Sequence, residues 1–285
     1  MFLNEQIARL QNDDHALPSI VLNTGFTSVL YDLPSVNLTE LTQASLMNRI
    51  DTKYYFDVEQ LTKLLNDIKG EYYALDMDGL RCIPYESLYF DTPGFDLYLQ
   101  HHNRKQNRYK MRYRRYVNTD RSFFEIKLKT NKGRTIKTRI PVEGIYSDLV
   151  EQAKQLLDQA QPPAPKKLIP VIWIAYSRIT LVSLNFSERV TIDIGLHFHT
   201  SETNVHWDSL CILEVKQDSA NRHSPISEAL KQLHLFPQSL SKYCVGVAAT
   251  FHHVKYNQFK KQLLKIKKIE RLHTHPHITE LCTNS

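Results

Sequence analysis

Glycine and cysteine are scarce in this sequence. Only 8 of the 285 residues are glycine and 12 are proline, which excludes collagen-like, repetitive and low-complexity chains. The four cysteines, Cys82, Cys211, Cys244 and Cys282, stand far apart and form no CxxC pair, so neither a disulfide framework nor a zinc site is expected. We predict four reduced thiols, as in a cytoplasmic protein.

A long uninterrupted apolar segment is also missing. The N-terminus has no cationic start followed by an apolar core, so no secretory signal peptide is expected. The most apolar stretch, residues 168–186, is broken by Arg178 and is rich in isoleucine, valine and aromatic residues, which favours a long β-strand over a membrane span. We expect a cytoplasmic protein, and its basic C-terminal end leaves open an association with the inner face of a membrane.

Positive charge exceeds negative charge by a moderate amount. The formal net charge is +6 and the pI is about 9.0, which favours an anionic partner without identifying it. Nucleic acid, acidic lipid and phosphate ligands are all compatible with this excess. Basic and aromatic residues alternate at 107–116, but no RRM, KH or OB signature accompanies them, so no nucleic-acid partner is expected.

The chain divides into three parts. Residues 1–41 form an N-terminal extension with a weak helical pattern at 5–10, and residues 42–254 carry a regular alternation of polar and apolar side chains. Residues 255–285 form a basic tail. Its pattern predicts a cationic amphipathic helix that lies on an acidic membrane or a partner, and the alternative is a solvated helix that packs by one edge on the domain.

Alternation of period two predicts that most of the central part is β-structure. Strands are predicted at residues 48–55, 71–77, 85–91, 107–117, 122–130, 134–142, 170–183, 188–195 and 210–217. Helices are predicted at residues 58–68, 94–102, 148–160, 224–233 and 241–251. Most of the long strands carry charged residues on one face and apolar residues on the other, as where Lys127 and Lys129 alternate with Ile126 and Leu128.

Two architectures explain this shared feature. In a β-sandwich, the charged faces point to solvent and the apolar faces form one core. In a closed barrel, the charged faces line the interior and helices cover the apolar outside. Because crowded ammonium groups repel and lose hydration, that interior requires a bound anion of high charge density. Glu125, Asp193 and Glu214 lie among the cations, and such carboxylates suit a Mg²⁺ or Mn²⁺ ion that bridges to phosphate oxygens.

Seven segments, taken in order and spacing, resemble a known family. They are RIDTKYYF at 49–56, YFDT at 89–92, NRYKMRYRRY at 107–116, FFEIKLKTNKGRTIKTR at 123–139, ERVTIDIGL at 188–196, LEVK at 213–216 and SKYCVG at 241–246. Across about residues 42–252, this set resembles the VTC (vacuolar transporter chaperone) domain. That family is the polyphosphate polymerase branch of the triphosphate tunnel metalloenzyme superfamily.

The resemblance implies a fold, a reaction and a site. The fold is α+β, with an eight-stranded antiparallel β-barrel that forms a tunnel flanked by helices. The reaction transfers the γ-phosphate of ATP to a growing inorganic polyphosphate chain, with Mn²⁺ or Mg²⁺. The residues that match catalytic positions are Lys53, Arg112, Arg114, Lys127, Arg139 and Lys242, and those expected to bind phosphate are Lys110, Lys129, Arg178, Arg189 and Lys216. Glu214 is the expected metal ligand, with Glu125 and Asp193 as further candidates.

Departures from the wider superfamily bear on the activity. Arg49 and Asp51 stand where other tunnel enzymes begin with ExExK, which favours the polymerase branch, and Ser239 and Leu240 precede SKY where eukaryotic relatives have more basic residues. Polymerase and hydrolase differ mainly in water access, so hydrolysis of tripolyphosphate or a nucleoside triphosphate is one alternative. A non-catalytic polyphosphate-binding subunit of a membrane assembly is another. The resemblance covers no membrane helix, which leaves open a separate membrane-protein partner met through the basic tail.

Overall fold

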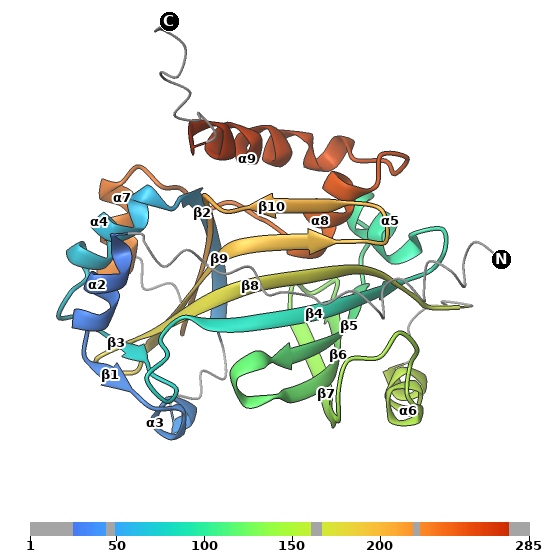
Figure 1. Cartoon of the computed structure of the whole chain (residues 1–285), viewed down its shortest axis with the longest axis horizontal. Helices are drawn as coiled ribbons and strands as arrows, with labels where there is room; N and C mark the ends of the chain where they lie inside the picture. The colour runs from blue at the N-terminus through green and yellow to red at the C-terminus, as the bar shows by residue number, and fades with distance from the viewer. Residues whose placement is uncertain (1–24, 44–48, 161–166, 219–222, 274–285) are drawn as a thin grey trace, which may run out of the picture.

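One long antiparallel sheet runs through the molecule, and helices surround it (Figure 1). The computed structural model describes residues 25–43, 49–160, 167–218 and 223–273. The helical pattern at residues 5–10 lies outside these ranges. Among the described helices, none has the length and apolar character needed to cross a bilayer. The predicted α+β class is confirmed.

Eight strands form the continuous path of the sheet, and each is antiparallel to its neighbours. In pairing order they are β2 (Arg49–Asp57), β11 (Leu210–Asp218), β9 (Glu188–His199), β8 (Ile169–Ser183), β4 (Ile83–Asp91), β5 (Arg108–Tyr116), β6 (Arg121–Lys129) and β7 (Thr135–Val142). Three short strands pair off this path: β10 (Asn204–Trp207) with β9, β3 (Tyr72–Leu75) with β8, and β1 (Ser35–Val36) with β3.

The predicted closed barrel is not observed. β2 and β7 end the path, and within the described residues no pairing joins them. A barrel requires its two edge strands to hydrogen-bond to each other, so this sheet stays open. Residues 135–139 of β7 are accordingly exposed. Alternation of period two predicts the face to which a side chain points, but it carries no information on whether two distant edges meet.

Eight α-helices occur in the described residues. They are α2 (Phe26–Asp32), α3 (Leu38–Gln43), α4 (Glu59–Asp67), α5 (Asp96–His102), α6 (Glu151–Ala160), α7 (Pro225–Gln232), α8 (Lys242–Thr250) and α9 (Lys260–His273). Two 3₁₀ turns, η1 (Val117–Thr119) and η2 (Asn257–Phe259), join elements. The helices predicted in the central part are confirmed with ends shifted by at most three residues, whereas the sequence pattern predicts none of α2, α3, β1 and β10.

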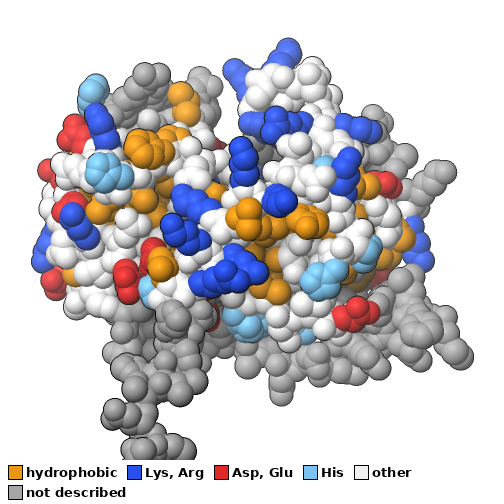
Figure 2. Space-filling view, turned by 90° about the horizontal axis from the view of Figure 1, so that it is seen from above, with side chains coloured by type: hydrophobic (Ala, Val, Ile, Leu, Met, Phe, Trp, Pro, Cys, Tyr) orange, Lys and Arg blue, Asp and Glu red, His pale blue; other side chains and the backbone are white. Residues whose placement is uncertain are grey.

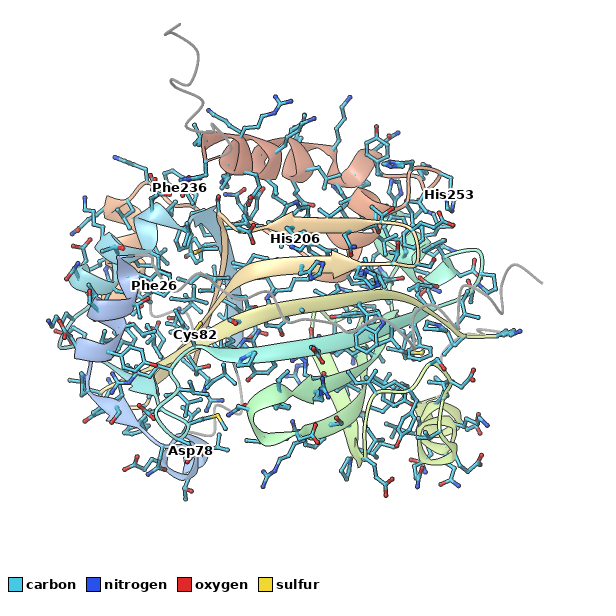
Figure 3. The ribbon with its side chains drawn as sticks, viewed as in Figure 1. Phe26, Asp78, Cys82, His206, Phe236 and His253 are labelled. Carbon is cyan, nitrogen blue, oxygen red and sulfur yellow. The ribbon has the colours of Figure 1, made fainter. Side chains whose placement is uncertain are left out.

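Helices cover the apolar side of the sheet. α2, α4 and α7 pack on β2, β8, β9 and β11, where Phe56, Ile192 and Leu213 are buried. Phe26 of α2, labelled in Figure 3, belongs to the same cluster. α6 packs on the other end of the sheet, in a cluster that includes Phe124 of β6. The apolar faces of the strands therefore meet helices, which leaves the opposite face for the charged side chains.

That opposite face changes from charged to apolar along β9. Gly195, with a φ of +58°, lies where the β8–β9 register shifts, and the extra residue there changes the phase of the alternation. Asp193 and Phe198 therefore both face α8, although residues five positions apart in a regular strand point to opposite faces. A Cβ on Gly246 of α8 would lie 2.4 Å from Phe198 Cδ1, so only glycine permits this approach. The apolar side chains of α8 cover the apolar end of this face and leave its charged end uncovered.

Candidate anion-binding site

The pairing register brings the predicted site residues to one face of the sheet. Residues directly opposite each other on neighbouring strands point to the same side. The opposite pairs, from β2 to β7, are Lys53 with Glu214, Lys216 with Arg189, Asp193 with Arg178, Lys110 with Lys127, Arg112 with Glu125, Glu125 with Arg139, and Arg108 with Lys129. Arg114 follows Arg112 by two residues and shares its side. Strands far apart in sequence thus present one cationic surface.

Glu125 is the centre of the first charged group. It is fully buried, and Arg112 Nε and Nη2 lie 2.8 and 2.5 Å from its Oε2, while Lys137 Nζ lies 2.5 Å from its Oε1. Burial alone would raise the pKa of Glu125, but Arg112, Arg114 and Lys137 outweigh it and hold this pKa well below its usual range. Glu125 is therefore a permanent anion enclosed by cations.

Lys137 belongs to this group although the family resemblance assigns it no role. Lys137 lies two residues before Arg139 and therefore on the same face of β7. This spacing of two was the signal available in the sequence. Burial lowers the pKa of Lys137 to about 8, and the neighbouring Glu125 limits the decrease.

Lys127 stands among these cations without a partner. Within the described residues it makes no hydrogen bond and no ion pair. Repulsion from Arg112, burial and repulsion from Arg114 hold the pKa of Lys127 well below its usual range, although Glu125 attracts it. Arg112, Arg114, Lys127 and Lys137 thus act together on the single carboxylate of Glu125. The charge of this group is not balanced from within.

Arg114 and two tyrosines connect this group with the next one. Arg114 donates to Tyr176 Oη at 2.6 Å and to Ser87 Oγ at 3.3 Å. Its guanidinium lies 5.4 Å from the ring centre of Tyr85, and that of Arg178 lies 5.2 Å from the same ring. Electron-rich ring faces stabilise both cations without cancelling their charge. The sequence reasoning missed these tyrosines, because an uncharged residue in an alternating strand carries no distinguishing signal.

Asp193 is the centre of the second group. Arg178 holds it through two bonds, Nε to Oδ1 at 2.6 Å and Nη2 to Oδ2 at 2.8 Å, and Lys242 Nζ also bonds to Oδ2. Arg178 and Lys242 lower the pKa of Asp193 against the opposing effect of burial. Lys242 begins α8, where the Ser241 side chain accepts from the Cys244 N–H, and Lys110 Nζ donates to the same Ser241 oxygen at 2.7 Å. The start of α8 is thus fixed to β5 and β9.

Glu214 is the centre of the third group. Lys53 Nζ lies 2.6 Å from its Oε1, and Lys216 Nζ lies 3.6 Å from its Oε2. Burial would raise the pKa of Glu214, but Lys216 and Lys53 lower it to about 2. The Glu214 side chain keeps 19% of its surface exposed, whereas that of Glu125 keeps none. Of these two carboxylates, Glu214 is therefore the accessible one.

Three of the predicted residues lie at the margin of these groups. Arg189 donates to the Leu41 carbonyl at 2.9 Å, and Lys129 donates to the Gly133 carbonyl. Arg139 is exposed on β7 and its guanidinium lies 4.5 Å from the ring centre of Phe123. These cations share the face with the others, and the contacts described here join them to two backbone carbonyls and an aromatic ring.

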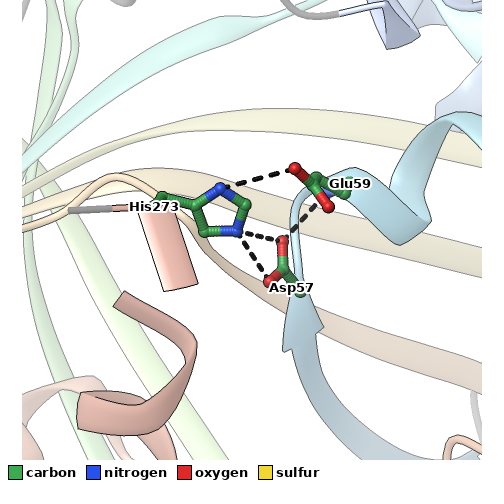
Figure 4. A group of neighbouring side chains, drawn as sticks. All are labelled: Asp57, Glu59 and His273. Atoms are coloured by element: carbon green, nitrogen blue, oxygen red, sulfur yellow. Dashed lines mark hydrogen bonds and ion pairs between the residues drawn. The ribbon is translucent and has the colours of Figure 1, made fainter. Parts of the chain in front are cut away.

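The predicted metal ligands do not lie together. Glu125, Asp193 and Glu214 each occupy a separate group, and cations contact both oxygens of each. In the part of the chain that the structure describes, one group of three side chains has potential ligand atoms within 4.8 Å of one another, namely Asp57, Glu59 and His273 (Figure 4). That group includes none of the predicted ligands. Of the three carboxylates, Glu214 is the most exposed.

Comparison with known proteins identifies the family. The model of the VTC domain matches residues 48–251, which is more than half of the chain. No curated protein sequence matches at a significant level. The solved structures that are similar include a Hippeastrum protein reported to have a dominant triphosphatase activity, with 14% identity and a TM-score of 0.46 over 71% of this chain and 97% of that chain. A conserved hypothetical protein from Pyrococcus furiosus has 16% identity and a TM-score of 0.40, over 69% of this chain and 99% of that chain.

Proposed function

The chain belongs to the VTC domain family, and on this premise we propose that it is a metal-dependent polyphosphate polymerase that transfers the γ-phosphate of ATP to a growing inorganic polyphosphate chain. The observation that supports this most strongly is the unbalanced charge around Glu125. Arg112, Arg114, Lys127 and Lys137 surround that one carboxylate, and the pKa of Lys127 is depressed by its cationic neighbours. Such a group becomes stable when a polyanion supplies the missing negative charge.

The two arginines and Lys127 have complementary parts in phosphate binding. A guanidinium is a planar fork that can donate two parallel hydrogen bonds to phosphate oxygens, whereas an ammonium acts as a compact point charge. Arg112 and Arg114 are held in place by Glu125, Tyr89 and Tyr176, so their geometry is set before the ligand arrives. Preorganised cations bind a phosphate chain more tightly than a patch of flexible surface lysines does, because less side-chain entropy is lost on binding.

The proposed chemistry needs no nucleophilic side chain. A terminal oxygen of the polyphosphate chain attacks the γ-phosphorus of ATP, a new P–O bond forms, and the bond between the γ-phosphorus and the β,γ-bridging oxygen breaks, so ADP leaves with that electron pair. The protein aligns the two chains and neutralises the oxygens of the transferred phosphoryl group. We propose that these oxygens are neutralised by Arg112, Arg114 and Lys127. Lys53 and Lys242 would bind the phosphate chain at the other end of the same face.

Mn²⁺ or Mg²⁺ is proposed as the cofactor, with Glu214 as its protein ligand. These ions are commonly held by one or two carboxylates together with substrate phosphate oxygens, and the partly exposed Glu214 fits that arrangement. Glu125 and Asp193 fit it less well, because both are almost completely buried. When bound, the metal would withdraw charge from the phosphate oxygens.

Hydrolysis is the second candidate activity, and the open sheet favours it. Residues 135–139 of β7 are exposed, and the Lys137 side chain keeps 35% of its surface accessible beside the Glu125 group. Water can therefore approach the group that would hold the transferred phosphate. With water as the nucleophile, the same cations would support cleavage of tripolyphosphate or a nucleoside triphosphate.

One incubation separates these activities. The protein is mixed with ATP and Mn²⁺, and the products are resolved on a polyphosphate gel with a parallel assay for free phosphate. Chains longer than the substrate support the polymerase, and free phosphate alone supports the hydrolase. Failure to turn over ATP, with retained polyphosphate binding, would instead assign the protein as a non-catalytic binding subunit. A Lys127→Met variant serves as the site control, and Lys63→Met, on the helical side of the sheet, serves as the matched surface control.

The remaining expectations form part of the same proposal. We propose that residues 42–254 are the catalytic domain, flanked by the extension at 1–41 and the basic tail at 255–285, and that ATP and inorganic polyphosphate are its ligands. We propose a cytoplasmic location and a separate membrane-protein partner for product export. Copurification from detergent extracts, with and without the tail, tests that partner.

A further inference from the structure

α9 presents two different faces. Successive residues of an α-helix are about 100° apart, so one set of its side chains falls within an arc of about 140°. These residues, all exposed, are Lys260, Lys261, Leu264, Lys267, Lys268, Arg271 and Leu272. We call them the outer face of α9. The opposite arc carries Leu263, Ile266 and Ile269, which pack in the cluster beneath the helix.

The inner side fixes α9 to the sheet. Glu270 Oε2 accepts a hydrogen bond from the Ser209 backbone N–H at 3.3 Å. His273 Nε2 lies 2.8 Å from an Asp57 carboxylate oxygen, and His273 Nδ1 lies 3.5 Å from Glu59 (Figure 4). The helix is thus held by polar contacts as well as by apolar burial. The outer face is therefore not needed to attach the helix to the domain.

Four lysines of the outer face have no matching acid in the described ranges. Lys260, Lys261, Lys267 and Lys268 make no ion pair with any carboxylate in the described ranges. Glu270, the one acidic residue of α9, lies on the inner side. Figure 2 looks onto the side of the molecule where α9 lies, and Lys and Arg side chains gather across its middle. The face is complementary in charge to an anionic surface.

Two exposed leucines lie among these cations. Leu264 is 58% exposed and Leu272 is 63% exposed. They are eight residues apart, or about 12 Å along the helix axis. Both border one shallow hollow together with Lys267, Lys268 and Arg271. A polyphosphate chain or a nucleic-acid backbone gives leucine no apolar contact, whereas the acyl chains below a layer of anionic headgroups do.

We propose that the outer face of α9 docks on the anionic lipid surface of a membrane. The lysines would contact headgroup phosphates, and Leu264 and Leu272 would reach the boundary of the acyl chains. This goes beyond the polymerase activity and does not depend on it. α9 lies at the opposite side of the molecule from β7 and α6 (Figure 1), so docking leaves the β7 edge of the sheet facing away from the bilayer.

Vesicle flotation of the full chain tests this docking. Binding is expected to phosphatidylcholine vesicles that contain phosphatidylglycerol, and not to phosphatidylcholine alone. The triple variant Lys261→Glu, Lys267→Glu, Lys268→Glu should weaken binding at least about 30-fold, since each cation near an anionic surface contributes substantially. The matched variant Lys63→Glu, Lys167→Glu, Lys231→Glu changes the net charge equally at exposed sites outside α9, and it should stay within about threefold of the wild type.

The leucines supply the second arm of the test. The variant Leu264→Ser, Leu272→Ser keeps every charge and should weaken binding to the anionic vesicles by about tenfold. Unchanged binding of this variant would mean that the face is a plain polyanion site, and equal losses in the two charge variants would mean that net charge alone acts. Either result, or no binding to anionic vesicles, overturns the proposal. Circular dichroism of each variant checks the fold, and none of these measurements requires ATP.

Discussion

Arg112 of β5 and Glu125 of β6 lie directly opposite each other, and the two N–H groups of Arg112 reach a carboxylate that is sealed from solvent. Water cannot compensate the charge of this carboxylate, so Arg112 and Lys137 must do so. Glu125 thereby holds these cations in place. Glu125 is a single anion among four cations, so the site that it organises with Arg112 still lacks negative charge.

Glu125→Gln is expected to destabilise the protein. Removal of one partner of a buried ion pair typically costs about 3–5 kcal/mol, and here it leaves four cations without their common carboxylate. Urea unfolding monitored by circular dichroism measures the loss. Added tripolyphosphate should restore more stability to this variant than to the wild type. If Glu125→Gln is as stable as the wild type when no ligand is present, Glu125 has no organising role. The control is Glu151→Gln, at an exposed site on α6, which should change stability by less than about 1 kcal/mol.

Lys127→Met is expected to separate stability from binding. Its cationic neighbours repel the charge of Lys127, so an apolar side chain of similar length should leave stability unchanged or raise it. Affinity for tripolyphosphate should fall by roughly 10- to 100-fold, because one charge-assisted contact is lost. Isothermal titration calorimetry and thermal unfolding report the two effects. Equal tripolyphosphate affinity in Lys127→Met and wild type would remove Lys127 from the site.

Anion binding should weaken as the pH rises through about 8. The pKa of Lys137 lies near 8 in the folded protein, so the side chain loses its positive charge in that range. A bound polyanion favours the charged form, and binding at pH 8 should therefore take up protons. Calorimetry in two buffers of different ionisation enthalpy measures this uptake.

The stability of the ligand-free protein should change in the opposite sense. Lys137 binds fewer protons in the folded than in the unfolded state between about pH 8 and 10.5, so its contribution to stability increases with pH in that window. Lys137→Arg keeps the charge at every pH tested and should remove the pH dependence of binding near 8. A wild-type affinity that is flat from pH 7 to 9 contradicts the assignment.

Glu214→Gln is expected to reduce metal affinity while the fold persists. The pKa of Glu214 is about 2, so the carboxylate is ionised and ready to bind a cation at neutral pH. Loss of this ligand should weaken Mn²⁺ binding in the presence of tripolyphosphate by at least about tenfold. Electron paramagnetic resonance of free Mn²⁺ provides the measurement, with Glu228→Gln on α7 as control. If Mn²⁺ affinity is unaltered, another group holds the metal.

His273 should make the attachment of α9 pH-dependent. Asp57 raises the pKa of His273 through a hydrogen bond, so this contact contributes fully below about pH 6.5 and is lost as the pH rises through the raised value. The protection of α9 amides against hydrogen exchange, corrected for the intrinsic pH dependence of the exchange rate, should therefore be weaker at pH 8 than at pH 6. His273→Gln should abolish that difference in protection and His252→Gln should preserve it, whereas equal corrected protection at both pH values in the wild type would exclude the contact as a stabiliser.

Much of the sheet was predictable because strand periodicity is a local property. Residues 122–130 and 134–142 alternate with period two, and β6 and β7 occur there with the charged residues on one face. The helices at 148–160 and 224–233 also follow from local patterns. The phase change at Gly195 was not predictable in this way, because a single extra residue in a strand leaves the composition of the segment unchanged.

The ion pairs of the site were beyond the reach of the sequence. Lys53 and Glu214 are 161 positions apart and meet only because β2 and β11 pair in one register. The choice of Glu214 over Glu125 as the accessible carboxylate also depends on burial, which alternation does not reveal. α2 was not predicted either, although Phe26 and Leu30 are buried against α4 and its neighbours, because a short helix depends on tertiary contacts.

The sequence by itself determined which side chains share a face, since alternation and covalent geometry force successive residues of a strand to opposite sides. It thereby determined the cationic character of that face and the family to which the chain belongs. Only the tertiary structure decided which cation meets which carboxylate, where α8 and α9 attach, and that β2 and β7 do not pair. Those outcomes depend on contacts between segments that are remote in the chain. Burial and charge pairing stabilise such contacts according to distance in space, whatever the separation in sequence.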